Sequence, residues 1–196
     1  MPLWGATDSD ESKPKNLTTA EKKQVFANAS GWVLEAGSAL SGNDNASATP
    51  EVLVAIGGLA TSIGAADVTE VEWITTAFDK SDGGTLSVRV RYNEAVTVTG
   101  SPTIAVTNGN QGSGSGRGPH TLVYASGTGS NELVFSLAIA AGNAATNAND
   151  VLTIGAQNIL KPGGATIKDT ADGTTASAVA ISAGQGTDAG SITVAA

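Results

Sequence analysis

Apolar and polar residues alternate through the middle of the chain. Between Leu86 and Tyr92 every second residue is apolar, and the intervening positions include Arg89 and Arg91. Because successive side chains of a strand point to opposite faces, this pattern predicts a strand with its apolar face on a core and both arginines on the other face. The same pattern, with every second residue apolar, recurs between Leu133 and Leu137. The predicted inward positions are Leu86, Val88, Val90, Leu133, Phe135 and Leu137.

Short strand signals continue to the end of the chain, separated by turns rich in glycine, asparagine and aspartate. We expect strands within residues 68–78, 86–92, 96–98, 103–107, 122–124, 133–139, 152–160, 165–168, 178–181 and 192–194. No helical spacing lies between them. Residues 67–196 are therefore expected to form an all-β domain, a β-sandwich with Greek-key connections.

Residues 1–66 differ from the rest of the chain in their pattern of apolar and polar residues. Short apolar islands at 24–27 and 31–34 stand in a polar background, which favours an extended N-terminal arm that docks on a partner. Thr18 followed by Glu21 predicts a capping box and a short helix. Residues 51–56 predict a strand, and residues 64–67 a hinge into the all-β domain.

The composition of the chain excludes several classes of partner and of functional site. Charged residues make up 14% of the 196 residues, aromatic residues make up 4%, and the net charge is −8. An acidic chain without a basic cluster argues against nucleic acid or an anionic membrane as partner. The absence of cysteine excludes disulfides, thiolate metal sites and a cysteine nucleophile. The first residues are acidic and contain no apolar run of signal-peptide length, so we expect no signal-directed export.

Beyond residue 67 the chain resembles the bacterial Ig-like modules of large adhesins. The resemblance rests on VTEVEWITTAFDKSDGGTLSVRVRYNEAVTVTGSPTIAV, on HTLVYASGTGSNELVFSLAIAAGN and on ILKPGGATIKDTADG, in that order, over about two-thirds of the chain. It implies an Ig-like Greek-key sandwich. Such sandwiches serve binding and scaffolding far more often than catalysis.

The N-terminal region is similar to virion structural proteins of marine tailed phages, particularly the myoviruses of cyanobacteria. The matching segments are MPLWGATDSDESKPKNL, QVFANASGWVLEAGS and ATPEVLVAIGGLA. This similarity implies a place in an assembled virion, made in the host cytoplasm.

The sequence contains few groups for catalysis or metal binding. His120 is the single histidine, no Gly-x-Ser-x-Gly elbow stands between a strand and a helix, and we expect no enzyme activity and an exposed histidine at a strand edge. Adhesin Ig-like repeats often hold calcium through carboxylates. The candidates here are Asp67, Asp79, Asp82, Glu94, Asp150, Asp169 and Asp172. The turn at 143–150 keeps one acid, Asp150, where the modules have three, so we expect no metal and no cofactor.

Two segments are candidates for partner binding. The N-terminal arm combines aromatic anchors with basic residues: Trp4, Lys13, Lys15, Lys22, Lys23, Phe26 and Trp32. Trp4 and Trp32 could instead pack back on the all-β domain. The second segment is the glycine-rich loop 108–119, a candidate surface-binding tip with Asn108, Gln111, Arg117 and His120, or a plain connection.

Together these observations predict a non-enzymatic virion structural protein. We expect a capsid decoration or cement protein on the capsid exterior that docks through its arm on the major capsid protein or another virion protein. The alternatives are a tail, neck or fibre component, or a module that binds host-surface glycans weakly. Self-association is also open.

Overall fold

The computed structural model describes residues 13–14, 16–109, 118–142 and 145–196. The fold is mostly β, with 46% strand and 10% helix, which confirms the all-β prediction. The described helices are short: α2 (Thr19–Lys22), α3 (Leu59–Ser62), α4 (Ala183–Asp188) and a 3-10 turn at Pro162–Gly164. None of them is long and apolar enough to cross a membrane.

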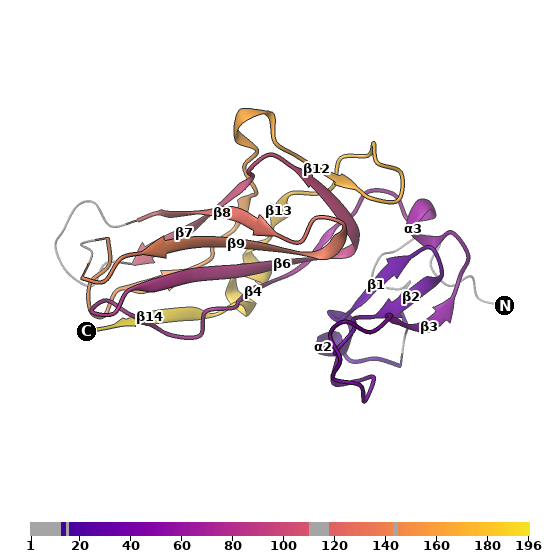
Figure 1. Cartoon of the computed structure of the whole chain (residues 1–196), viewed down its shortest axis with the longest axis horizontal. Helices are drawn as coiled ribbons and strands as arrows, with labels where there is room; N and C mark the ends of the chain where they lie inside the picture. Colours follow the sequence, from indigo (N-terminus) through magenta and orange to yellow (C-terminus); the bar gives the residue numbers. More distant parts are fainter. Residues whose placement is uncertain (1–12, 15, 110–117, 143–144) are drawn as a thin grey trace.

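The N-terminal strands form a small antiparallel sheet, which we call the N-terminal sheet (Figure 1). It consists of β1 (Val25–Asn28), β2 (Gly31–Leu34) and β3 (Glu51–Ala55). A tight turn joins β1 to β2, where the Asn28 side chain accepts a hydrogen bond from the backbone N–H of Ser30 at 2.7 Å. Gly31 has φ +135°, and a Cβ there would lie 2.0 Å from the carbonyl oxygen of Val54, so only glycine fits between β2 and β3.

The N-terminal sheet has a small hydrophobic core of its own. Its buried members are Val25, Ala27, Trp32, Leu34, Leu59 and Ala60. The prediction of an extended arm is therefore wrong for the described part of residues 1–66. The apolar islands at 24–27 and 31–34 are the two strands of a hairpin, and they bury their side chains against each other and against α3.

Most of the remaining chain forms the other, larger part of the strand arrangement, which we call the large sheet. Its strands are β4 (Val68–Trp73), β5 (Phe78–Asp79), β6 (Gly84–Thr99), β7 (Thr103–Gly109), β8 (His120–Ser126), β9 (Ser130–Ile139), β10 (Val151–Thr153), β12 (Thr166–Asp169) and β14 (Ser191–Ala195). From β6 the order runs β6-β9-β8-β7-β10-β14-β5, and β4 and β12 also pair with β6. Two further strands, β11 (Gln157–Asn158) and β13 (Ala180–Ile181), form a separate pair.

One hydrophobic core lies inside this sheet. It includes Leu86, Val88, Val90, Leu133 and Phe135, all 0% exposed, as the alternation predicts. Leu137 is partly buried and packs against the same core. Residues of β10 and β14 share this core with residues of β6 and β9, so the sheet folds over itself to enclose the core.

The long strand β6 also connects the two parts of the molecule. It pairs with β4 up to Tyr92 and with β9 up to Arg91, and its pairing with β9 resumes at Val96 after a register shift. Within this irregular stretch Glu94 pairs in parallel with Ala27 of β1. The N-terminal sheet therefore extends the large sheet at the bend of β6, and lies beside it (Figure 1).

Candidate functional site

The face of the large sheet opposite its core carries a ladder of opposite charges. Arg89 and Arg91 of β6 stand opposite Glu72 and Glu70 of β4, and Arg91 also stands opposite Glu132 of β9. Nη1 of Arg91 lies 2.6 Å from Oε2 of Glu70, and its Nε donates to Oε1 of Glu132 at 2.8 Å. Opposite charges on facing strands stabilise a sheet, so this ladder ties three strands together.

The ladder continues into the N-terminal sheet. Oε1 of Glu35, just after β2, lies 3.3 Å from Nε of Arg91 and accepts a hydrogen bond from Nδ2 of Asn131 at 2.9 Å. In addition, Nζ of Lys23, which precedes β1, lies 3.0 Å from Oε1 of Glu70. These contacts join segments far apart in the chain, so the two parts of the molecule are held together by charge as well as by the β1–β6 pairing.

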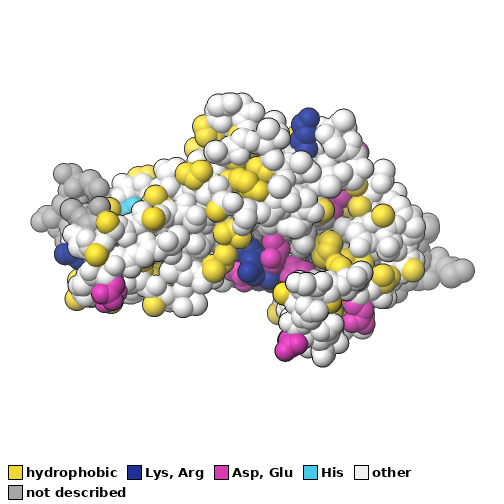
Figure 2. Space-filling view, viewed as in Figure 1, with side chains coloured by type: hydrophobic (Ala, Val, Ile, Leu, Met, Phe, Trp, Pro, Cys, Tyr) yellow, Lys and Arg dark blue, Asp and Glu magenta, His cyan; other side chains and the backbone are white. Residues whose placement is uncertain are grey.

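Figure 2 shows basic and acidic side chains gathered at the notch between the two parts. The N-terminal part of the chain covers Arg91 more than Arg89. The side chain of Arg91 is 11% exposed, compared with 30% for Arg89. Burial raises the pKa of Glu35, and the positive charge of Arg91 opposes that rise. Alternation predicts that both arginines face away from the core, but it does not predict that Glu35 covers one of them.

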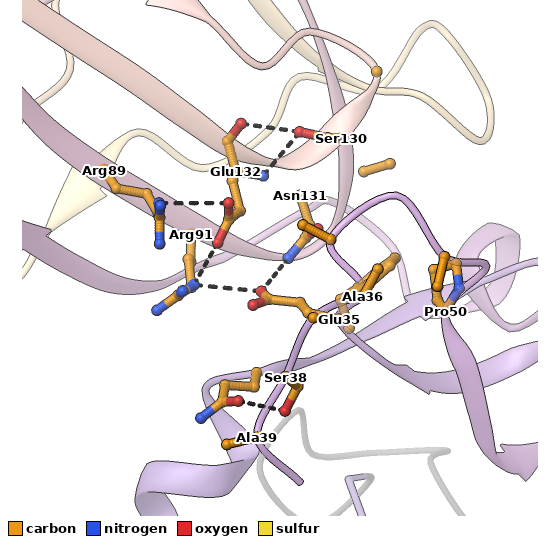
Figure 3. Close-up of a pocket in the computed structure, with 17 residues that line it drawn as sticks. Glu35, Ala36, Ser38, Ala39, Pro50, Arg89, Arg91, Ser130, Asn131 and Glu132 are labelled. Atoms are coloured by element: carbon orange, nitrogen blue, oxygen red, sulfur yellow. Dashed lines mark hydrogen bonds and ion pairs between the residues drawn. The ribbon is translucent and has the colours of Figure 1, made fainter. Parts of the chain in front are cut away.

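A groove of about 620 Å³ opens at this junction, and we call it the junction groove. One side is polar, with Arg89, Arg91, Asn131 and Glu132 (Figure 3). The lining from the N-terminal part comprises Gln24, Phe26, Glu35, Ala36, Gly37, Ser38, Ala39, Ala46, Ala48 and Pro50. Ala95, Gly129 and Ser130 complete it. No single stretch of sequence signals this groove, since its lining comes from four separate segments.

The predicted arm residues that the structure describes lie in and around the N-terminal sheet. Trp32 is 0% exposed in the core of that sheet, so its side chain is not available as an anchor for a partner. Lys13 is also buried, donates from Nζ to the carbonyl of Lys22 at 2.9 Å, and lies 5.9 Å from the centre of the Trp32 ring. Lys23 is engaged with Glu70, as above. Phe26 lies half-buried in the lining of the junction groove, while Trp4 and Lys15 lie outside the described residues.

The other predicted segment is partly described. Nδ2 of Asn108 donates to Oδ2 of Asp150 at 3.0 Å and lies 3.2 Å from Nε2 of His120. His120 is 6% exposed, so the expected exposed edge histidine is wrong. Burial lowers its pKa, opposed by the negative charge of Asp150. The structure thus brings together Asn108 and His120 as parts of a buried polar cluster, whereas Gln111 and Arg117 lie outside the described residues.

The seven carboxylates considered for calcium do not form one cluster. Asp79 and Asp82 lie at the turn between β5 and β6, Asp150 lies just before β10, and Glu94 of β6 lies near Asp67, Asp169 and Asp172. Asp79 and Asp172 accept hydrogen bonds from backbone N–H groups of their own turns. Within the described ranges no three histidine, aspartate or glutamate side chains are arranged to hold a metal ion.

Glu94 differs from the other carboxylates. It is 0% exposed, and in the described part of the chain neither of its carboxylate oxygens has a hydrogen-bond partner. Burial, together with the negative charges of Asp169, Asp172 and Asp67, raises its pKa to about 8. The sequence offers no signal for this burial, because it results from the docking of β1 on β6.

Comparisons of the chain with protein-family models, with curated proteins and with solved structures find no match. The class of this protein is therefore defined by its fold, an all-β chain in which a small N-terminal sheet is joined to a larger folded sheet.

Proposed function

We propose that this chain is a non-enzymatic virion structural protein, a decoration or cement protein on the exterior of a phage capsid that displays an Ig-like β-sandwich. One observation carries the proposal: the two resemblances fall on two different folded parts. The phage-like segments QVFANASGWVLEAGS and ATPEVLVAIGGLA contain β1, β2 and β3. The Ig-like segments contain β4, β5, β6, β8, β9 and β12 and the first part of β7. This division suits a subunit with one part for attachment and one for display.

The attachment surface we propose is the outer edge of the N-terminal sheet. In the described structure β3 pairs on one side with β2, and its other edge is open. Val52 on β3 is 47% exposed, and Leu40 is 40% exposed in the preceding loop. An open edge with exposed apolar side chains can add to a partner's sheet or pack on a partner's surface. The partner is the major capsid protein or another virion protein.

The experiment measures binding of the purified protein to phage particles that lack it. We expect the wild-type chain to bind, and Val52→Lys to lose most of its binding, because a lysine at the centre of an interface introduces an uncompensated charge. Val123→Lys is the matched control, since Val123 is 40% exposed on β8, away from the N-terminal sheet. Wild-type binding by the Val52 variant would exclude β3 as the attachment edge.

Copy number separates the capsid location from the alternatives. Quantitative mass spectrometry of purified particles should find hundreds of copies for a capsid decoration protein, since that role repeats over the lattice. A handful of copies would favour a tail, neck or fibre component. Absence from the particle would overturn the virion proposal itself.

A further inference from the structure

The attachment proposal leaves the junction groove without a role, although the lining of the groove reaches Pro50, just before β3. It is lined by two strands of the large sheet, by the segments around β1 and β2, and by the segment that leads into β3. Its volume of about 620 Å³ falls within the range of about 300–1,000 Å³ that is usual for sites that bind small molecules. It exists only because the N-terminal sheet is docked on β6.

The charged groups of the groove balance one another. Its lining contains two cations, Arg89 and Arg91, and two anions, Glu35 and Glu132. They are interlocked, with Nε of Arg89 3.4 Å from Oε2 of Glu132 and Nε of Arg91 close to both carboxylates. Each charged group of the groove lies next to a group of opposite charge. A charged ligand that approached one of them would therefore also approach a group that repels it. The groove therefore favours a neutral ligand.

Hydrogen-bond donors and acceptors alternate over short distances in the same lining. The guanidinium of Arg89 donates, the carboxylate of Glu132 accepts, and the side-chain amides of Gln24 and Asn131 do both. Several of these groups are held in place before any ligand arrives: Nδ2 of Asn131 donates to Glu35, and Oε1 of Gln24 accepts from Oγ of Ser38 at 2.6 Å. Such a surface complements a ligand with many hydroxyl groups, because each hydroxyl both donates and accepts.

The opposite part of the lining is apolar and built from small side chains. Ala36, Ala46, Ala48 and Pro50 line it, together with the half-buried ring of Phe26 on β1. Figure 3 shows the charged network on one side of the groove and Ala36 and Pro50 on the other. An apolar wall facing a polar one suits a ligand that has C–H faces as well as hydroxyls. Sugar rings have both.

We propose that the junction groove is a binding site for a neutral oligosaccharide. Its polar wall binds hydroxyl groups through Arg89, Asn131 and Glu132, and its apolar wall packs against the C–H face of a sugar ring. This site differs from the loop at residues 108–119, since Asn108 and His120 belong to a separate buried cluster.

The test is a titration of the full-length, isotope-labelled chain followed by nuclear magnetic resonance. The probes are neutral trisaccharides of glucose, galactose, mannose and N-acetylglucosamine, each added to about 10 mM, because weak glycan binding falls in the millimolar range. We expect at least one of them to shift the backbone amides of Gly37 and Gly129 and the side-chain amides of Gln24 and Asn131. Trilysine and sialyllactose should shift them less, because each carries an unbalanced charge.

Ala48→Trp provides the variant that blocks the groove without cutting any of its ion pairs. It should weaken the binding of the active trisaccharide at least about tenfold. Ala138→Trp, an exposed alanine on β9, is the matched control and should bind like the wild type. The proposal is overturned if no neutral trisaccharide shifts the groove amides, if Ala48→Trp binds as tightly as the control, or if the shifts gather at Asn108 and His120.

Discussion

Replacing Glu94 with glutamine should stabilise the protein at neutral and alkaline pH. The folded structure buries this carboxylate completely, provides no hydrogen-bond partner for it among the described residues, and places Asp67, Asp169 and Asp172 near enough to repel its charge. Glutamine has nearly the same shape and no charge. It removes the cost of ionisation and retains the packing where β1 meets β6.

The sign and size of the effect follow from the pKa of Glu94. That pKa is about 8 in the folded protein, compared with 4.5 for an ordinary glutamate. Between these values the folded state holds one proton more than the unfolded state, so the free energy of unfolding falls as pH rises. The loss approaches about 1.4 kcal/mol per pH unit, and it amounts to about 3 kcal/mol by pH 7. Below the pKa of Glu94 in the unfolded state, ionisation of Glu94 costs no stability. Above its pKa in the folded state, the loss of stability is complete.

The assay is urea denaturation of the wild type and of Glu94→Gln from about pH 5 to about pH 9. The difference between the two proteins isolates Glu94, because Glu35 and His120, whose pKa values are also shifted, are common to both. Glu51→Gln, which alters an exposed carboxylate on β3, controls for the change in net charge. We expect the advantage of Glu94→Gln to grow steadily with pH up to about pH 8.

Two parallel curves would refute this reasoning. If the wild type and Glu94→Gln lost stability equally across the range, Glu94 would have the same pKa folded and unfolded. Its burial would then carry no electrostatic cost.

Further variants test the ladder and the core of the N-terminal sheet by urea denaturation. Arg91→Met should lower the free energy of unfolding by about 3 kcal/mol, since it leaves Glu35 and Glu70, whose side chains are 14% and 13% exposed, without their common partner. Arg89→Met should cost about 1 kcal/mol or less, because its pairs are more exposed; equal losses would contradict the ranking. Trp32→Ala should cost about 4 kcal/mol through lost packing. Val52→Ala, at an exposed site, should cost less than about 0.5 kcal/mol, and a Trp32→Ala effect this small would contradict the burial argument.

Local patterns predicted the strands of the large sheet well. The alternation from Leu86 to Tyr92 assigns each side chain to a face because the period of a strand is set by its own backbone geometry. The capping box at Thr18 and Glu21 was confirmed for the same reason, since its hydrogen bonds span three residues. A matching box at Ser182 and Gln185 begins α4, and its signal, a serine followed three residues later by a glutamine, is present in the sequence.

The fold of the N-terminal region depends on how its short apolar segments pair. Taken one at a time, the apolar islands at 24–27 and 31–34 are too short to bury a tryptophan. The turn between them, with Asn28 before Ser30 and Gly31, joins them into a hairpin and could have predicted the small sheet. Trp32 then becomes a core residue rather than an anchor.

The sequence by itself determined the all-β class, the inward and outward faces of the central strands and the positions of several turns. Each of these depends on steric rules that act over a few residues. The tertiary structure alone decided that Glu35 covers Arg91, that Glu94 loses its solvent, and that a groove forms between the two parts. These features join residues dozens of positions apart, and they depend on which surfaces meet when β1 pairs with β6, which no local pattern records.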